Sequence, residues 1–88
     1  MKIRPSARVS WQIYENKVYI LDETDETMTL LDNAGFQFWI IMLTTPRYSD
    51  VLLKLKSVFI FESERMVEEL KSFVDELVKN GIIEVDNE

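Results

Sequence analysis

The sequence predicts an α+β domain in which a three-stranded antiparallel sheet is followed by three helices. Residues 8–14 alternate apolar and polar side chains with a period of two, which is typical of a half-buried strand, and two further strand-like runs follow short turn segments. In residues 33–79, apolar side chains instead recur at intervals of three and four, which is typical of amphipathic helices. We expect a single domain over residues 1–88, because a second domain would leave neither half enough interior.

Three strands are expected in the N-terminal third, over residues 8–14, 17–22 and 26–31. The first strand places three apolar residues on one buried face: Val9, Trp11 and Ile13. The second strand is apolar on both faces, which predicts that it lies at the centre of the sheet. Glu15 and Asn16 form a tight first connection and an acidic turn, "DETD", forms the next, so the order 1-2-3 is expected. The third strand then lies at an edge.

The third expected strand reads "ETMTLL" and contains no lysine, proline or glycine. Natural proteins usually protect an edge strand with such residues, because its unpaired N–H and C=O groups otherwise pair with another chain. The absence of these residues indicates an edge kept open for a visiting strand.

Helices are expected over residues 33–44, 49–59 and 64–79. Asp32 is a good N-cap for the first helix, which is apolar on most sides and should be largely buried, and Pro46 ends it. The second helix carries one apolar face: Val51, Leu52, Leu55, Val58 and Phe59. Ser63 is expected to cap the third helix and Gly81 to be its C′ residue. Residues 82–85 either add a short strand or pack beneath the helices.

The third helix has an apolar arc of about 140°, against the roughly 100° that a core-facing stripe needs. Its members, in angular order, are Phe73, Met66, Leu77, Leu70, Val74, Val67 and Val78. Either this small protein wraps the helix deeply, or one margin of the arc stays open. We expect the open margin to be that of Phe73 and Met66, whose side chains are large and adaptable. Glu69 and Glu62 border this margin and could meet a basic group on a partner.

The composition argues against catalysis and against cofactors. The chain has no cysteine and no histidine, and its two glycines form no phosphate-binding loop. The carboxylates Glu64, Glu68 and Asp75 project opposite the apolar arc, so we interpret them as a solvated helix face. With no secretory signal and no long apolar run, the expected location is the cytoplasm, away from membranes.

Two other functions are compatible with this order of elements. A winged-helix regulator that binds nucleic acid has a similar order of elements, but residues 62–80 carry six acidic and three basic side chains, a net charge of −3 on the would-be recognition helix. The whole chain has a net charge of −6, so we expect no nucleic-acid partner. The edge strand could also pair with its own copy across a two-fold axis, which would give a homodimer.

In this order of elements, the sequence resembles the PqqD-like family, the precursor peptide recognition elements of RiPP biosynthesis, which are small winged-helix-like domains. The resemblance runs from about Arg8 to Val85. It rests on the three strands, on Leu-Asp at a helix start in "LLDNAGFQFWIIML" with its Trp39, and on a last helix that ends "LVKNGII". The chain is most similar to the stand-alone recognition proteins of lasso-peptide pathways.

The resemblance implies a peptide chaperone without catalytic activity. Such proteins bind the leader of a ribosomally made precursor as an extra antiparallel strand on the third strand, with apolar side chains in a groove against the third helix. They hand the precursor to a leader peptidase or another modifying enzyme. The peptide-binding residues implied here are Thr27, Met28, Thr29, Leu30, Leu31, Met66, Glu69, Leu70 and Phe73. The negative net charge favours leaders that carry Lys or Arg near the groove.

Overall fold

The computed structural model describes residues 1–58 and 64–87. Five strands and three helices lie in this part of the chain, in the order β1 (Lys2–Pro5), β2 (Val9–Tyr14), β3 (Lys17–Asp22), β4 (Thr27–Leu31), α1 (Asn33–Thr44), α2 (Tyr48–Val58), α3 (Glu64–Lys79) and β5 (Ile83–Asp86). The expected three-stranded antiparallel sheet is present, with the order β2-β3-β4. The α+β class and the central place of β3 are therefore confirmed.

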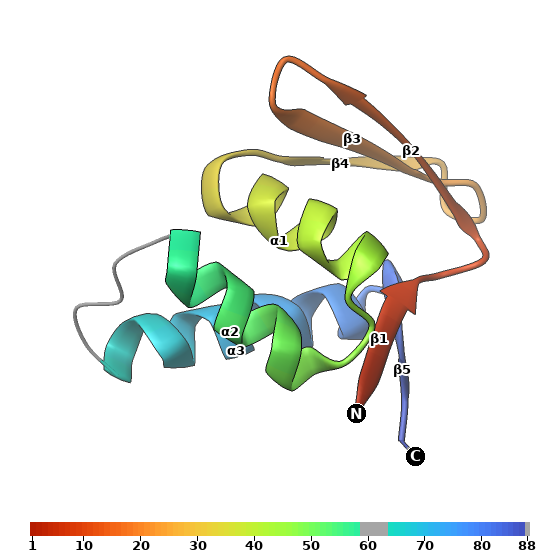
Figure 1. Ribbon diagram of the computed structural model, residues 1–88. Coiled ribbons are helices and arrows are strands. Elements are labelled where there is room, and N and C mark those ends of the chain that lie inside the picture. Colours follow the sequence, from red (N-terminus) through yellow and green to blue (C-terminus); the bar gives the residue numbers. More distant parts are fainter. Residues whose placement is uncertain (59–63, 88) are drawn as a thin grey trace.

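The predicted architecture lacked a second sheet. β1 and β5 pair antiparallel, with Ile3 opposite Val85, and bring the two termini together at one end of the molecule (Figure 1). The other edge of β1 contacts the α1–α2 connection, where the Ile3 amide donates to the Pro46 carbonyl at 2.8 Å. Ile3 is buried. The sequence gives little sign of β1. Ile3 is the one aliphatic residue of this segment, it lies between Lys2 and Arg4, and Pro5 follows, so no hydrophobic period can be recognised.

The turns of the three-stranded sheet follow from local chemistry. Glu15 and Asn16 both have positive φ, 50° and 61°, as a two-residue hairpin requires, which confirms the tight connection. In the β3–β4 turn, Asp22 Oδ1 accepts hydrogen bonds from the backbone amides of Thr24 at 2.9 Å and Asp25 at 3.3 Å. This side chain thus organises the acidic turn in the way that aspartates commonly do.

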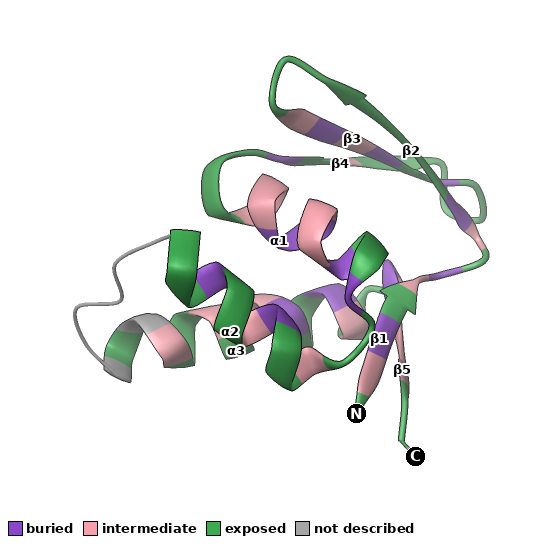
Figure 2. Ribbon diagram, viewed as in Figure 1, coloured by how far each residue is buried: buried purple, intermediate pink, exposed green. Residues whose placement is uncertain are grey.

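The predicted burial of the first strand of this sheet was wrong. In β2 only Val9 is buried, whereas Trp11 is 40% exposed and Ile13 45% exposed (Figure 2). Trp11 and Trp39 of α1 pack in a T-shaped arrangement, with ring centroids 5.5 Å apart. The sheet extends beyond the helices, so the period-two pattern identifies the inward face of β2 without guaranteeing that anything covers it.

α1 lies between the three-stranded sheet and the pair α2 and α3 (Figure 1). Its buried residues are Phe38, Trp39 and Met42. Asp32 occupies the N-cap position with extended backbone, but its side chain makes no capping hydrogen bond. In α2, the buried residues are Val51 and Leu55, while Val58, predicted to share that face, is 54% exposed. The predicted positions Phe59, Glu62 and Ser63 lie outside the described residues.

The end of α3 has the capping geometry that Gly81 predicts. Gly81 has φ of +73°, its amide donates to the Val78 carbonyl at 3.0 Å, and the Ile82 amide donates to the Leu77 carbonyl at 2.9 Å. This pair of bonds is the Schellman motif. The positive φ favours glycine at this position, and a Cβ atom there would lie only 2.6 Å from Cζ of Arg8, so the guanidinium of Arg8 would have to shift.

Candidate functional site: the open edge of β4

β4 is paired on one side only. Thr29 lies opposite Ile20 of β3, and no strand in residues 1–58 or 64–87 pairs with the other edge of β4. Along this strand, Leu31 is buried and Thr29 is partly buried, whereas Met28 and Leu30 are 66% and 50% exposed. Because successive side chains of a strand point to opposite faces, Thr27, Thr29 and Leu31 face inward and Met28 and Leu30 face outward.

The C-terminal end of β4 lies beside an apolar cluster. Gly35 of α1 lies within ordinary contact distance of both β4 and α3, since a Cβ atom there would be 3.4 Å from Cζ of Phe73 and 3.5 Å from Cβ of Leu31. The Phe73 ring meets Phe38 edge-on, with centroids 5.6 Å apart. Strand β4 and helix α3, which the sequence predicted to form one site, are therefore brought together here through the first turn of α1.

The N-terminal end of β4 lies beside a polar cavity of about 410 Å³. Residues of β4, of the β3–β4 turn, of the segment before β2 and of the end of α3 line this cavity. They are Arg8, Asp22, Asp25, Thr27, Thr29, Lys79, Asn80 and Ile82. Arg8 Nη2 donates to Asp22 Oδ2 at 2.8 Å and to the Asn80 carbonyl at 2.9 Å, and lies 3.7 Å from Asp25 Oδ2. Arg8 thus connects the β3–β4 turn to the end of α3.

Asp22 is the buried carboxylate of this network. Burial alone would raise the pKa of its carboxyl group, but the backbone amides of Thr24 and Asp25 and the guanidinium of Arg8 outweigh burial, so the pKa of Asp22 is lowered. Asp22 is therefore ionised at neutral pH and holds Arg8 in place. Sequence reasoning assigned the "DETD" segment to a turn and missed this role, because the partner Arg8 opens the first predicted strand and no local pattern links it to Asp22.

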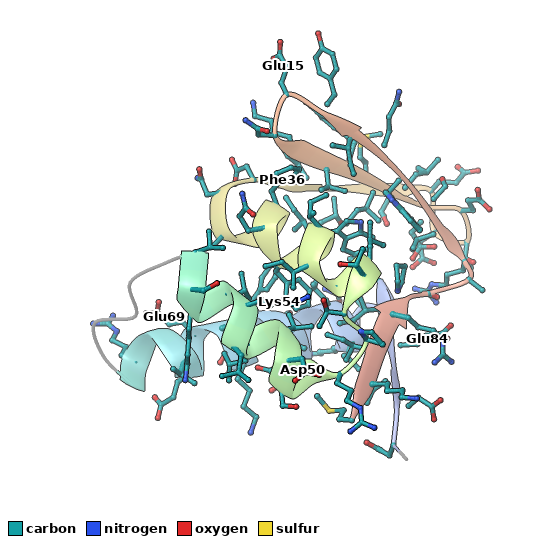
Figure 3. All side chains as sticks on the ribbon, in the orientation of Figure 1. Glu15, Phe36, Asp50, Lys54, Glu69 and Glu84 are labelled. Atoms are coloured by element: carbon teal, nitrogen blue, oxygen red, sulfur yellow. The ribbon has the colours of Figure 1, made fainter. Side chains whose placement is uncertain are left out.

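The predicted residues on α3 have different environments. Leu70 and Phe73 are partly buried against the core. Glu69 is exposed and accepts a hydrogen bond from Arg65 Nε at 3.1 Å, one turn earlier, so it already pairs with a cation of its own helix. It lies on α3 well away from the β2–β3 hairpin, whose tip carries Glu15 (Figure 3). The Met66 side chain lies outside the described part of the structure.

Apolar side chains also cover the outer face of the sheet. Tyr14, Leu21, Met28 and Leu30 are between 39% and 66% exposed. The register places Leu21 opposite Met28, and Tyr19 opposite Leu30. The run Val18–Leu21, apolar on both faces, predicted a strand at the centre of the sheet, and β3 lies there. Leu21, on the outer face of this central strand, is nevertheless 39% exposed.

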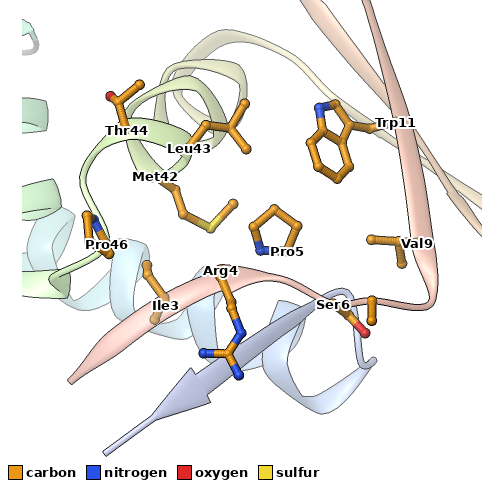
Figure 4. A pocket seen from close by; sticks show the side chains of 11 residues that line it. Ile3, Arg4, Pro5, Ser6, Val9, Trp11, Met42, Leu43, Thr44 and Pro46 are labelled. Atoms are coloured by element: carbon orange, nitrogen blue, oxygen red, sulfur yellow. The ribbon is translucent and has the colours of Figure 1, made fainter. Parts of the chain in front are cut away.

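A second cavity, of about 510 Å³, lies at the opposite edge of the sheet. Figure 4 shows Trp11 and Val9 of β2 facing Met42 and Leu43 of α1 across this cavity, with Pro5 between them. Within the described residues, β2 therefore has another unpaired edge beside a cavity.

We find no group of three acidic side chains placed to bind a metal ion among the residues described, and none of their helices is long and apolar enough to cross a bilayer.

No protein-family model and no curated protein matches the chain. Among solved structures, TbiB1 in complex with the TbiA(beta) leader peptide superimposes with a TM-score of 0.84 over 100% of both chains, at 18% sequence identity. At this identity the match establishes a shared fold. The chain therefore has the fold of a protein solved with a leader peptide bound, which confirms the resemblance noted from the sequence at the level of the fold.

Proposed function

We propose that this protein binds the leader region of a ribosomally synthesised precursor peptide, as an antiparallel strand added to the open edge of β4. The observation that carries the proposal is this unpaired edge, flanked by an apolar cluster at one end and a polar cavity at the other. Strand addition draws affinity from main-chain hydrogen bonds and specificity from pockets for alternate side chains. The fold shared with TbiB1, which was solved in complex with a leader peptide, supports the choice of ligand.

The peptide-binding residues proposed are those of the strand, Thr27 to Leu31, with Leu70 and Phe73 of α3 and, at the margin, Glu69 and Met66. We also propose that the protein performs no chemistry and hands the bound precursor to a modifying enzyme, most simply the leader peptidase of a lasso-peptide pathway. The chain would then act by concentrating and orienting the leader for that enzyme.

The first test is a titration of the fluorescein-labelled leader of a precursor peptide encoded beside the gene, followed by anisotropy. We expect saturable binding at about micromolar concentration, which corresponds to roughly −8 kcal/mol. Scanning the leader with N-methyl amino acids is the sharper form of this test. Each N-methyl group removes one amide donor, so strand addition predicts that binding weakens at every second position of the docked segment.

Two proline variants of the protein test the same geometry from the other side. The amides of Met28 and Thr29 point in opposite directions, so one faces β3 and the other faces the open edge. We expect one variant, Met28→Pro or Thr29→Pro, to lose stability, because proline removes an amide that donates a hydrogen bond to β3. The other should stay folded and lose leader binding by tenfold or more.

β2 offers the matched control, since it is the other edge of the same sheet. Of Gln12→Pro and Ile13→Pro, the variant that stays folded should bind leader as the wild type does. Normal binding by the folded β4 variant, or loss of binding by the folded β2 variant, would refute the assignment to β4. Delivery is tested separately, by adding the protein to the peptidase and full-length precursor, where we expect faster cleavage that the folded β4 proline variant does not support.

A further inference from the structure

The two ends of β4 differ in the chemistry that they offer to a strand lying beside them. At Leu31 the surroundings are apolar: Gly35, Phe38 and Phe73 lie within one cluster of contacts. At Thr27 the surroundings are the polar cavity. From Leu31 to Thr27 is four residues, or about 13 Å along a strand. A visiting strand would therefore meet both environments within five residues.

The alternation of side chains determines which peptide residues meet these environments. In an antiparallel pair, side chains directly opposite each other share one face of the sheet. Peptide residues opposite Leu31, Thr29 and Thr27 therefore point inward, and those opposite Leu30 and Met28 point outward. Because the peptide runs antiparallel to β4, the residue opposite Leu31 precedes the residue opposite Thr27 by four positions.

The charges that line the polar cavity cancel. Two cations, Arg8 and Lys79, face two carboxylates, Asp22 and Asp25, so the formal sum is zero. Arg8 and Asp22 are already bound to each other, whereas the Asp25 side chain is 62% exposed and Lys79 is exposed. A charged peptide group would meet a like charge as well as an opposite one, and an apolar group would cover polar groups without pairing them. A side-chain amide or hydroxyl supplies both a donor and an acceptor.

From this juxtaposition we infer that the docked peptide carries an apolar side chain opposite Leu31 and, four residues later, a neutral hydrogen-bonding side chain opposite Thr27. Asparagine, glutamine, serine and threonine meet the second requirement. This inference rests on the proposed function and adds to it the order and polarity of the inward-facing leader residues.

The test is a selection from a display library of short peptides whose consecutive positions are randomised, with the intact protein as bait. We expect enriched peptides to align on an apolar residue followed four positions later by an amide or hydroxyl residue. Alignment in the reverse order, or charged or apolar residues at the later position, would overturn the inference while leaving strand addition intact. Failure to enrich any peptide would count against the proposed function itself.

Charge variants then test whether the later peptide residue lies in this cavity. Lys79→Gln leaves the lining with a net charge of −1 and should shift preference toward Lys or Arg, while Asp25→Asn leaves +1 and should shift it toward Asp or Glu. We expect shifts of roughly three- to fivefold, the size of one exposed charge pair. Lys71→Gln is the matched control, because Lys71 is an exposed lysine of α3 outside the cavity lining. An equal shift in Lys71→Gln would assign the effect to the net charge of the protein and overturn the inference.

Discussion

Gly81→Ala is the substitution that most sharply tests how the end of α3 is held against the sheet. A non-glycine residue at φ of +73° costs about 1–2 kcal/mol. The new Cβ would also lie 2.6 Å from Arg8 Cζ, so the guanidinium must move and lose its 2.9 Å hydrogen bond to the Asn80 carbonyl, which is worth about 1 kcal/mol. The free energy of unfolding should fall by about 2–3 kcal/mol.

Urea unfolding followed by tryptophan fluorescence measures this loss. With a slope near 1 kcal/mol/M, the midpoint should fall by about 2–3 M. Gly35→Ala is the matched control, since Gly35 lies inside α1 and its Cβ would make only ordinary contacts. That variant should be as stable as wild type or up to about 0.5 kcal/mol more stable, because alanine favours helix.

The double variant separates the two causes. In Arg8→Ala the guanidinium that the new methyl group would strike is absent, so adding Gly81→Ala should cost only the backbone term, about 1–2 kcal/mol. If the losses of unfolding free energy in Arg8→Ala and Gly81→Ala simply add up in the double variant, the close approach of the new Cβ atom to the Arg8 guanidinium does not affect stability. A Gly81→Ala protein as stable as Gly35→Ala would refute the whole reasoning.

Two further predictions concern buried polar groups. Because its pKa is lowered on folding, Asp22 contributes stability above its ordinary pKa of 3.8 that is lost as pH falls through the folded value. Unfolding measured from pH 7 to pH 3 should therefore show Asp22→Asn less stable than wild type at pH 7, with the gap closing on acidification; a constant gap would contradict this. Trp39 is fully buried, and within the described residues its indole N–H has no acceptor, so Trp39→Phe should cost less than about 1 kcal/mol. Phe38→Leu, at an equally buried site, should cost more in the same urea assay, and the opposite ranking would contradict the account.

The order of elements could be predicted from the sequence because each element carries its own signal. The hairpin turn at Glu15 and Asn16, the end of α1 before Pro46 and the C′ residue Gly81 are all where local chemistry places them. β1 escaped prediction because its pairing with β5 joins the two ends of the chain, and only the folded molecule brings Ile3 opposite Val85.

Burial was predicted less well than secondary structure, and for one reason. Periodicity identifies which side chains share a face but not how far a neighbouring element extends over that face. Trp11 and Ile13 are on the inward face of β2 and still substantially exposed, and Val58 lies at the exposed end of α2. The outward side chains Met28 and Leu30 read as strand-forming residues, and only the packing reveals that they face solvent.

One part of the candidate site could be predicted from the sequence and the other could not. The unprotected edge was visible in "ETMTLL", because the absence of lysine, proline and glycine is a property of the sequence. The polar cavity was not visible, because Arg8 and Lys79 are 71 residues apart in the chain and meet only through the Schellman turn and the β3–β4 turn. Long-range charge networks of this kind have no local signature.

The most direct test of the central claim is hydrogen exchange of the β4 amides, measured residue by residue by NMR with and without leader peptide. Strand addition predicts that alternate amides between Thr27 and Leu31 become protected when leader is added, while the intervening amides, already bonded to β3, change little. The amides of β2 should be unaffected. Saturable binding that leaves every β4 amide unprotected, or that protects β2 instead, would contradict the account.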